Sequence, residues 1–168
     1  MNKENIKMNL SAWDSMVPEH FKSDFYDVPG FLKTGNHLNE LELKLLGNIQ
    51  GNKVAHLQCH FGMDTISLET LGARVTGLDF SSEAIETARS LAENMQSKAK
   101  FICANVLQAA QYMDRDFDLV FTTYGVLCWL DNLEQWAEQV HAILGPSGRL
   151  ILVEFHPFID MLSQDYTE

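Results

Sequence analysis

Basic residues are scarce in this sequence of 168 residues. It contains 12 Lys and Arg against 23 Asp and Glu, which gives a formal net charge of −11. A surface that follows nucleic-acid phosphates needs clustered Lys and Arg, and so does one that binds an anionic membrane. The charge therefore argues against nucleic-acid and membrane partners and favours a soluble protein.

Paired cysteines and long apolar runs are missing as well. The three cysteines, Cys59, Cys103 and Cys128, form no C-x-x-C pair, so we predict neither a disulfide framework nor a zinc ribbon. Each lies in an apolar setting, and we expect three buried thiols. The N-terminus has no signal-peptide run, and no stretch approaches the ~20 apolar residues of a membrane helix. These absences favour a cytoplasmic location.

What the sequence does contain is an alternation of short β-rich runs and helical patterns. The length fits one domain, and 46% of the residues are hydrophobic. The expected strands are 53–58, 73–78, 99–103, 117–123 and 148–155, and the expected helices are 37–47, 62–71, 81–96 and 131–144. This order predicts an α/β fold: a three-layer, doubly wound, mostly parallel sheet.

The first 35 residues differ from the rest because aromatic side chains lie among polar ones. They include Trp13, Phe25 and Tyr26, with a Pro-Gly turn at 29–30. The segment is expected either to pack aromatic groups over the body or to form a helix docked on the surface. We divide the chain into an arm or cap over the site, 1–35, and a cofactor-binding α/β domain, 36–168.

The loop after the first expected strand is poor in glycine. It reads "VAHLQCHFGMDT" over 54–65, with Gly62 alone where cofactor loops often carry three glycines. Parallel sheets bind ligands at the carboxyl ends of their strands, and Asp79 ends the second strand, where an acid accepts from ribose hydroxyls. Gln58 and His60 would crowd a pyrophosphate, which disfavours a nicotinamide-dependent reductase. A cofactor with a ribose but no diphosphate fits better.

Five segments between residues 50 and 156 resemble the class I S-adenosylmethionine-dependent methyltransferases. They are "VAHLQCHFG", "GARVTGLDFSSEAIETAR", "FICANV", "FDLVFTTYG" and "ILGPSGRLILVE", in the order of that family's motifs. The stretches "HLQCHFG", "YGVLCWL" and "VEFHP" are similar to a bacterial branch of it. The resemblance implies a Rossmann-like methyltransferase fold and S-adenosylmethionine as cofactor, with S-adenosylhomocysteine as product.

The resemblance also implies roles for individual residues. Asp64 would replace, for the cofactor's ammonium group, the family's acid at position 56, where this chain has His56. The other implied contacts are Gln58, Cys59, His60 and Gly62 to the methionine part, Asp79 to the ribose, Phe80, Asn105 and Val106 to adenine, and Thr123 and Tyr124 to the sulfonium. Asp79 and Asp64 could instead serve only the helices that they precede or begin.

Methyl transfer needs positioning more than a dedicated catalytic residue. We therefore name Tyr124, His156 and Tyr26 as candidates; His156 and Glu154 could equally be structural groups at a strand end. No metal site is expected from His56, Cys59 and His60, because alternate strand residues face opposite ways. The predicted function is methyl transfer to a small-molecule acceptor. The alternative is a non-catalytic cofactor-binding or association domain.

The C-terminal end departs from the family's usual sheet, which has seven strands and finishes with an antiparallel hairpin. This sequence stops about a dozen residues after the fifth strand, so the hairpin is expected to be lacking. The apolar fifth strand, "RLILVEF", would then be an exposed sheet edge, which promotes association. We predict that the chain either forms a homodimer through this edge or is a fragment of a longer protein.

Overall fold

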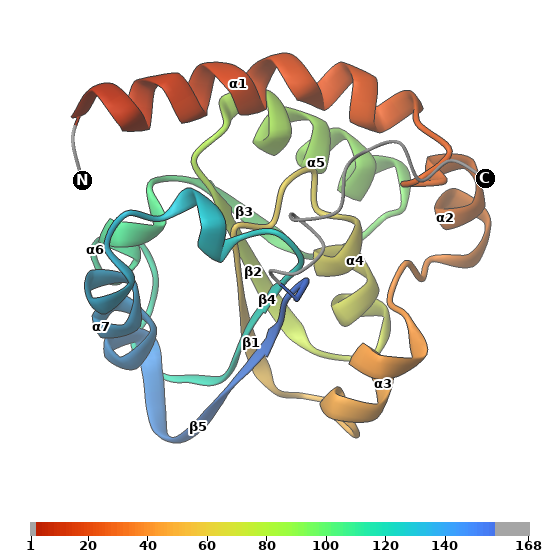
Figure 1. The fold of residues 1–168 in the computed structure, drawn as a ribbon. Helices are drawn as coiled ribbons and strands as arrows, with labels where there is room; N and C mark the ends of the chain where they lie inside the picture. The colour runs from red at the N-terminus through yellow and green to blue at the C-terminus, as the bar shows by residue number, and fades with distance from the viewer. Residues whose placement is uncertain (1–2, 157–168) are drawn as a thin grey trace.

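A computed structural model describes residues 3–156 of the chain, and its centre is a five-stranded parallel sheet (Figure 1). The strand order is β3-β2-β1-β4-β5. The strands are β1 (Lys53–Leu57), β2 (Arg74–Asp79), β3 (Lys100–Cys103), β4 (Phe117–Thr123) and β5 (Leu144–Val153). The predicted α/β class and its doubly wound parallel sheet are confirmed.

The strand order places the carboxyl ends of β1, β2 and β4 side by side. β1 is central: Ala55 is paired with Thr76 of β2 on one side and with Val120 of β4 on the other. Chain order reverses between β1 and β4, since β2 and β3 lie to one side and β4 and β5 to the other. Such a switch point opens a crevice above the strand ends, where parallel sheets bind ligands.

Helices cover both faces of the sheet. The helices α3 (Glu40–Leu46), α4 (Met63–Thr70) and α5 (Ser82–Asn94) cover one face, and α6 (Ala109–Tyr112) and α7 (Leu133–Ile143) cover the other. The predicted stripe of α5 is buried, and the Ser81 hydroxyl caps this helix by accepting from the Ala84 N–H at 3.1 Å. Short 3-10 turns, η1 (Val106–Gln108) and η2 (Leu127–Trp129), follow β3 and β4.

The N-terminal segment forms two further helices, α1 (Lys3–Lys22) and α2 (Val28–Thr34). In Figure 1, α1 crosses over α5 at the top of the molecule. Val17 of α1 is buried in one apolar cluster with Val28 and Phe31 of α2 and with residues of α4 and α5. Within residues 3–156, no helix has both the length and the apolar character needed to cross a membrane.

Two expectations about local structure are wrong. Cys103 and Cys128 are exposed, although Cys59 is buried as predicted. Cys103 ends β3, an edge strand, and Cys128 lies in the η2 turn above the sheet, so apolar neighbours in sequence do not cover either thiol. β5 begins at Leu144, four residues before the expected strand at 148, and Pro146 is tolerated there because β5 is an edge strand.

The far edge of the sheet is apolar and open within the described residues. β5 pairs with β4 alone, and the side chains of Leu150 and Leu152 are 39% and 38% exposed. The exposed edge predicted from the sequence is therefore present in this part of the chain. Association through it stays a prediction.

The turn from β1 into α4 depends on glycine at position 62. Gly62 has φ +79°, and a Cβ there would lie 2.5 Å from the Phe101 ring and 3.0 Å from the Ala88 Cβ. We predict that Gly62→Ala lowers the free energy of unfolding in urea by about 2–4 kcal/mol, from left-handed strain plus overpacking. Gly51→Ala is the control: its φ is +80° but its Cβ would meet nothing within 4 Å, so a loss of about 1 kcal/mol is expected. Equal losses would refute the packing argument.

Candidate functional site

A cavity of about 460 Å³ opens above the carboxyl ends of β1, β2 and β4. Its volume lies in the range of small-molecule sites. The cavity is lined by every residue for which the sequence suggested a cofactor contact: Gln58, Cys59, His60, Gly62, Asp64, Asp79, Phe80, Asn105, Val106, Thr123 and Tyr124. The fold thus brings together residues from four separate loops around one space.

The loop between β1 and α4 has a glycine-like backbone at two positions that carry no glycine. Gln58 and His60 have φ angles of +55° and +50°, in the left-handed region, where a side chain costs about 1 kcal/mol or more. The Gln58 side chain offsets this cost, because its amide donates to the Val126 carbonyl at 3.1 Å and accepts from the Trp136 indole N–H at 3.2 Å. It therefore ties the β1 loop to the loop after β4 and to α7.

Asp79 holds the other side of the same loop. Its carboxylate accepts the backbone N–H groups of His60 at 2.8 Å and Ser81 at 3.0 Å. Burial raises the pKa of Asp79 to about 6, even though these backbone donors favour the anion. The carboxylate is thus charged at neutral pH and lines the cavity with lone pairs still able to accept hydrogen bonds.

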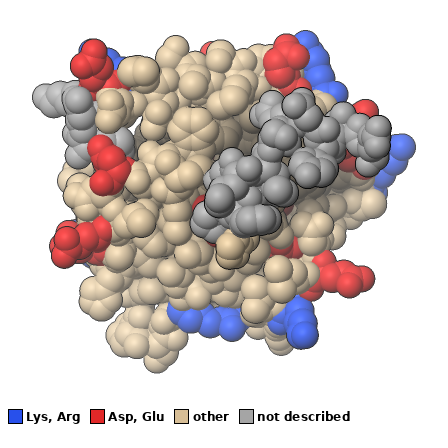
Figure 2. All heavy atoms as spheres, viewed as in Figure 1, with Lys and Arg blue, Asp and Glu red and all other residues tan. Residues whose placement is uncertain are grey.

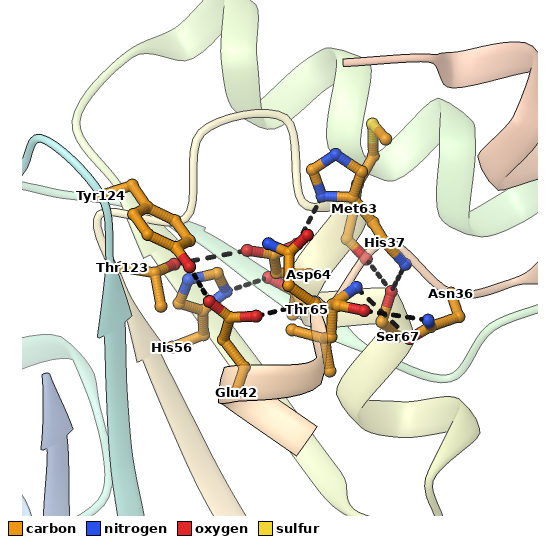
Figure 3. A network of polar contacts seen from close by, with 12 residues as sticks. Asn36, His37, Glu42, His56, Met63, Asp64, Thr65, Ser67, Thr123 and Tyr124 are labelled. Atoms are coloured by element: carbon orange, nitrogen blue, oxygen red, sulfur yellow. Dashed lines mark hydrogen bonds and ion pairs between the residues drawn. The ribbon is translucent and has the colours of Figure 1, made fainter. Parts of the chain in front are cut away.

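One end of the cavity is charged and polar (Figure 3). The Asp64 carboxylate lies 2.7 Å from the Nδ1 of His37 and accepts from the Thr123 hydroxyl at 3.3 Å. Burial alone would raise the pKa of Asp64, but the hydrogen bond from His37 and further favourable interactions bring it below its ordinary value. Behind this pair, buried Glu42 accepts from the Asn39 N–H and from the Tyr124 hydroxyl.

His37 is the site residue that the sequence analysis missed. It precedes α3, and its backbone N–H donates to the Ser67 hydroxyl of α4 at 2.9 Å, which fixes it beside Asp64. The pKa of His37 is raised, chiefly by the hydrogen bond to Asp64. No spacing or motif links position 37 to position 64, so the pair could be found only from the folded chain.

The other wall of the cavity is aromatic and includes the arm. The His60 ring lies within 5.4 Å, between centroids, of the rings of Trp13, His20, Tyr26 and Phe61. Both ring nitrogens of His60 are buried and, among the described residues, lack a hydrogen-bond partner. Burial lowers the pKa of His60 to about 3, so the ring is neutral and each nitrogen can bind a polar group of a ligand.

The three candidate catalytic residues lie in different surroundings. Tyr124 and Tyr26 line the cavity, and burial raises the pKa of Tyr26 to about 12, so this phenol stays protonated. His156 is exposed and is not part of the cavity lining. Glu154 accepts the backbone N–H groups of Gly125, Val126 and Leu127, which makes it a support for the loop after β4. The described residues contain no cluster of three metal-ligating side chains.

Charge is distributed away from the centre of the face seen in Figure 2. Where the grey atoms leave this face visible, most acidic and basic side chains lie toward its rim, and uncharged residues make up most of the rest. This view shows no basic patch of the kind that follows a phosphate backbone.

Known proteins resemble this chain in sequence and in structure. Residues 55–152 match the family described as a methyltransferase domain. A demethylmenaquinone methyltransferase of Lactococcus lactis subsp. lactis (strain IL1403) is 30% identical, over 98% of this chain and 67% of the relative. A ubiquinone biosynthesis O-methyltransferase of Alkalilimnicola ehrlichii is 28% identical, over 77% of this chain and 53% of the relative.

Among solved structures, the PH0226 protein from Pyrococcus horikoshii OT3 superposes with a TM-score of 0.63. The two chains are 28% identical, and the match covers 79% of this chain and 55% of that one. This chain thus spans between about half and two thirds of the length of these relatives.

Buried His56 generates a prediction about acid stability. Burial lowers the pKa of His56 to about 4, and its Nδ1 lies 2.8 Å from the Thr65 hydroxyl. In the unfolded chain His56 binds a proton below about pH 6.5, whereas in the folded chain it stays neutral down to about pH 4. Protonation of His56 in the unfolded state therefore lowers the free energy of unfolding by about 3 kcal/mol between pH 6.5 and pH 4. We expect His56→Gln to lose less stability than the wild type over that interval, in urea denaturation at both pH values.

The control for this prediction is His141→Gln, at an exposed position on α7. It should lose as much stability on acidification as the wild type does. If His56→Gln also behaved as the wild type, His56 would not be held neutral by the fold.

Proposed function

The chain belongs to the methyltransferase-domain family, whose cofactor is S-adenosylmethionine, and we propose that it transfers the cofactor's methyl group to a small-molecule acceptor. The observation that carries the proposal is the single cavity that gathers all of the cofactor contacts implied by the sequence. The cofactor supplies an electrophilic methyl group on a sulfonium. The chain has to bind, orient and enclose the reactants.

The residues present fit this cofactor. At the end of β2, the Asp79 carboxylate can accept from ribose hydroxyls, and Phe80 and Val106 beside it offer apolar surface to adenine. Asn105 can donate to and accept from the adenine edge, although its Oδ1 already accepts the Leu107 N–H at 2.9 Å. At the opposite end, Asp64 offers an anion to the ammonium group of the amino-acid end.

The loop after β1 also fits a cofactor without a diphosphate. Gln58 and His60 occupy the positions where glycines would admit a pyrophosphate, and their side chains are fixed by Trp136, Val126 and the aromatic wall. This geometry supports the prediction from the sequence that the cofactor is an adenosine compound and not a dinucleotide.

For the acceptor, we propose a planar aromatic compound with a hydroxyl group. Trp13, Tyr26 and Trp129 line the cavity and offer ring faces and edges, and the neutral His60 offers a donor and an acceptor. The names of two relatives, demethylmenaquinone methyltransferase and ubiquinone biosynthesis O-methyltransferase, support a quinol-like acceptor.

Catalysis by positioning follows from this arrangement. Thr123 and Tyr124 lie at the carboxyl end of β4, where the sulfonium is expected, and the Tyr124 hydroxyl is engaged by Glu42. Holding two reactants in line contributes ~7–11 kcal/mol to a barrier reduction without any proton transfer. When a hydroxyl oxygen accepts the methyl group, the oxygen–methyl bond forms as the methyl–sulfur bond breaks, and the hydroxyl proton passes to solvent water. We assign no side chain as general base.

The sheet edge and the exposed thiols bear on association and on location. Within residues 3–156 the β5 edge, with Leu150 and Leu152, is open, which supports a homodimer or a partner that pairs with this strand. The exposed thiols of Cys103 and Cys128 fit a reducing cytoplasm. A purely structural, non-catalytic domain would share this edge but would not need the charged and aromatic lining of the cavity.

Cofactor binding is tested with Asp79→Asn, which keeps the shape of the side chain and removes its charge. Isothermal titration of the wild type with S-adenosylhomocysteine should give micromolar binding, and Asp79→Asn should weaken it by about tenfold to a hundredfold, through loss of charge-assisted hydrogen bonds to the ribose. Asp131→Asn, at an exposed position outside the cavity, is the matched control and should bind as the wild type does. A folded wild type that binds nothing would exclude the proposal.

Methyl transfer itself is tested with methyl-tritiated S-adenosylmethionine. Reduced naphthoquinones and benzoquinones with a free hydroxyl are the acceptors of choice, and tritium should appear in the organic extract with the wild type and be strongly reduced with Asp79→Asn. Tight cofactor binding with no transfer to any of these compounds would favour the non-catalytic alternative.

A further inference from the structure

The proposed function gives Asp64 a role in the cavity but leaves its partner, His37, without one. Both residues line the cavity, and the Nδ1 of His37 lies 2.7 Å from the Asp64 carboxylate. In Figure 3, the ring of His37 turns one nitrogen to Asp64 and the other away from it. Among residues 3–156, no hydrogen-bond partner is found for this second nitrogen, Nε2.

Three contacts fix the orientation of the His37 ring. Its backbone is held to Ser67 of α4, its Nδ1 is held by Asp64, and its face stacks on Tyr26 at 6.3 Å and 14° between planes. A ring held in this way presents Nε2 in one direction without further loss of side-chain entropy on binding. The arrangement is therefore a preorganised donor rather than a surface histidine.

We infer that His37 binds the carboxylate of the cofactor's amino-acid end through Nε2–H, and that this contact makes cofactor affinity depend on the protonation of His37. The inference rests on the proposed function, because it assigns one group of the same cofactor. An α-amino acid is a zwitterion, and a neighbouring anion and cation form its complement. Asp64 takes the ammonium group, and the imidazolium beside it takes the carboxylate.

The charges around His37 decide when the imidazolium exists. Asp64 on α4, Glu42 on α3 and Asp27 at the start of α2 all face His37 with negative charge and raise its pKa above 6.5, against the effect of burial. Tyr26, stacked on the ring, stays neutral because its own pKa is raised to about 12. His37 is therefore a cation below its raised pKa and loses its charge as pH rises through that value. The neutral ring keeps its proton on Nδ1 beside Asp64, so Nε2 can no longer donate to a carboxylate.

The charge state of His37 also argues against a role as a proton acceptor. A general base must be neutral at the working pH, whereas Asp64 favours the charged ring. A charged imidazole is instead a strong hydrogen-bond donor to an anion.

The test compares two ligands that differ in the amino-acid end alone. S-adenosylhomocysteine carries it, and 5′-methylthioadenosine has the same adenosine and sulfur without it. The ratio of their dissociation constants, measured by isothermal titration, cancels effects on the adenosine contacts. It cancels in particular the titration of Asp79, whose pKa of about 6 affects both ligands.

We expect His37→Gln to weaken the binding of S-adenosylhomocysteine by about tenfold and to leave the dissociation constant of 5′-methylthioadenosine unchanged. In the wild type, the affinity advantage of S-adenosylhomocysteine over 5′-methylthioadenosine should fall as pH rises through the raised pKa of His37, and this pH dependence should be absent in His37→Gln. His141→Gln, an exposed histidine outside the cavity, should behave as the wild type does in both respects.

Each other outcome has a defined meaning. An unchanged ratio in His37→Gln, or a pH-independent ratio in the wild type, would overturn the role of His37 while leaving the cofactor site in place. Loss of both ligands in His37→Gln would assign His37 to structural support and would also overturn the inference. Failure of the wild type to bind either ligand would refute the proposed function, and the inference with it.

Discussion

The site depends on one hydrogen bond, from the His60 backbone N–H to the buried carboxylate of Asp79 at 2.8 Å. It joins the loop after β1 to the end of β2, and a second bond, from the Cys59 N–H to the Leu78 carbonyl at 3.0 Å, runs alongside it. The loop can make both because its backbone visits the left-handed region at Gln58, His60 and Gly62. Without these two hydrogen bonds the loop would not border the cavity. The buried Asp79 carboxylate would also lose the His60 N–H, a donor that favours its charged form.

The closed loop separates two environments within one cavity. Toward α3 and α4 the lining is ionic, with Asp64 and His37 in contact. Toward α1 it is aromatic, because Trp13 of the arm packs edge-on against His60 and against Trp129 at 5.4 Å. The arm is held down by Val17 in the core and by the Ser81 hydroxyl, which bonds to Asp14. One cofactor and one flat acceptor would each find a matching wall.

The sequence predicts the scaffold well because the scaffold follows local patterns. Each of the five apolar runs became a strand, and the stripe on α5 and its Ser81 cap are present, since periodicity and capping act over a few residues. The exposure of Cys103 and Cys128 was missed, because it depends on where an edge strand and a loop end up in the sheet. The positions that line the cavity were predictable from resemblance, whereas the bonds among them were not. His37 pairs with Asp64, 27 positions away, and Gln58 reaches Trp136, 78 positions away; neither contact leaves a pattern in the sequence.

The cavity above β1, β2 and β4 is proposed to hold S-adenosylmethionine in one orientation. A crystal structure of the chain with S-adenosylhomocysteine tests it most directly. We predict ribose hydroxyls within hydrogen-bond distance of the Asp79 carboxylate, adenine between Phe80 and Val106, and the amino-acid end at Asp64 and His37. Electron density for the ligand elsewhere, or in this cavity with its amino-acid end at Asp79, would contradict it.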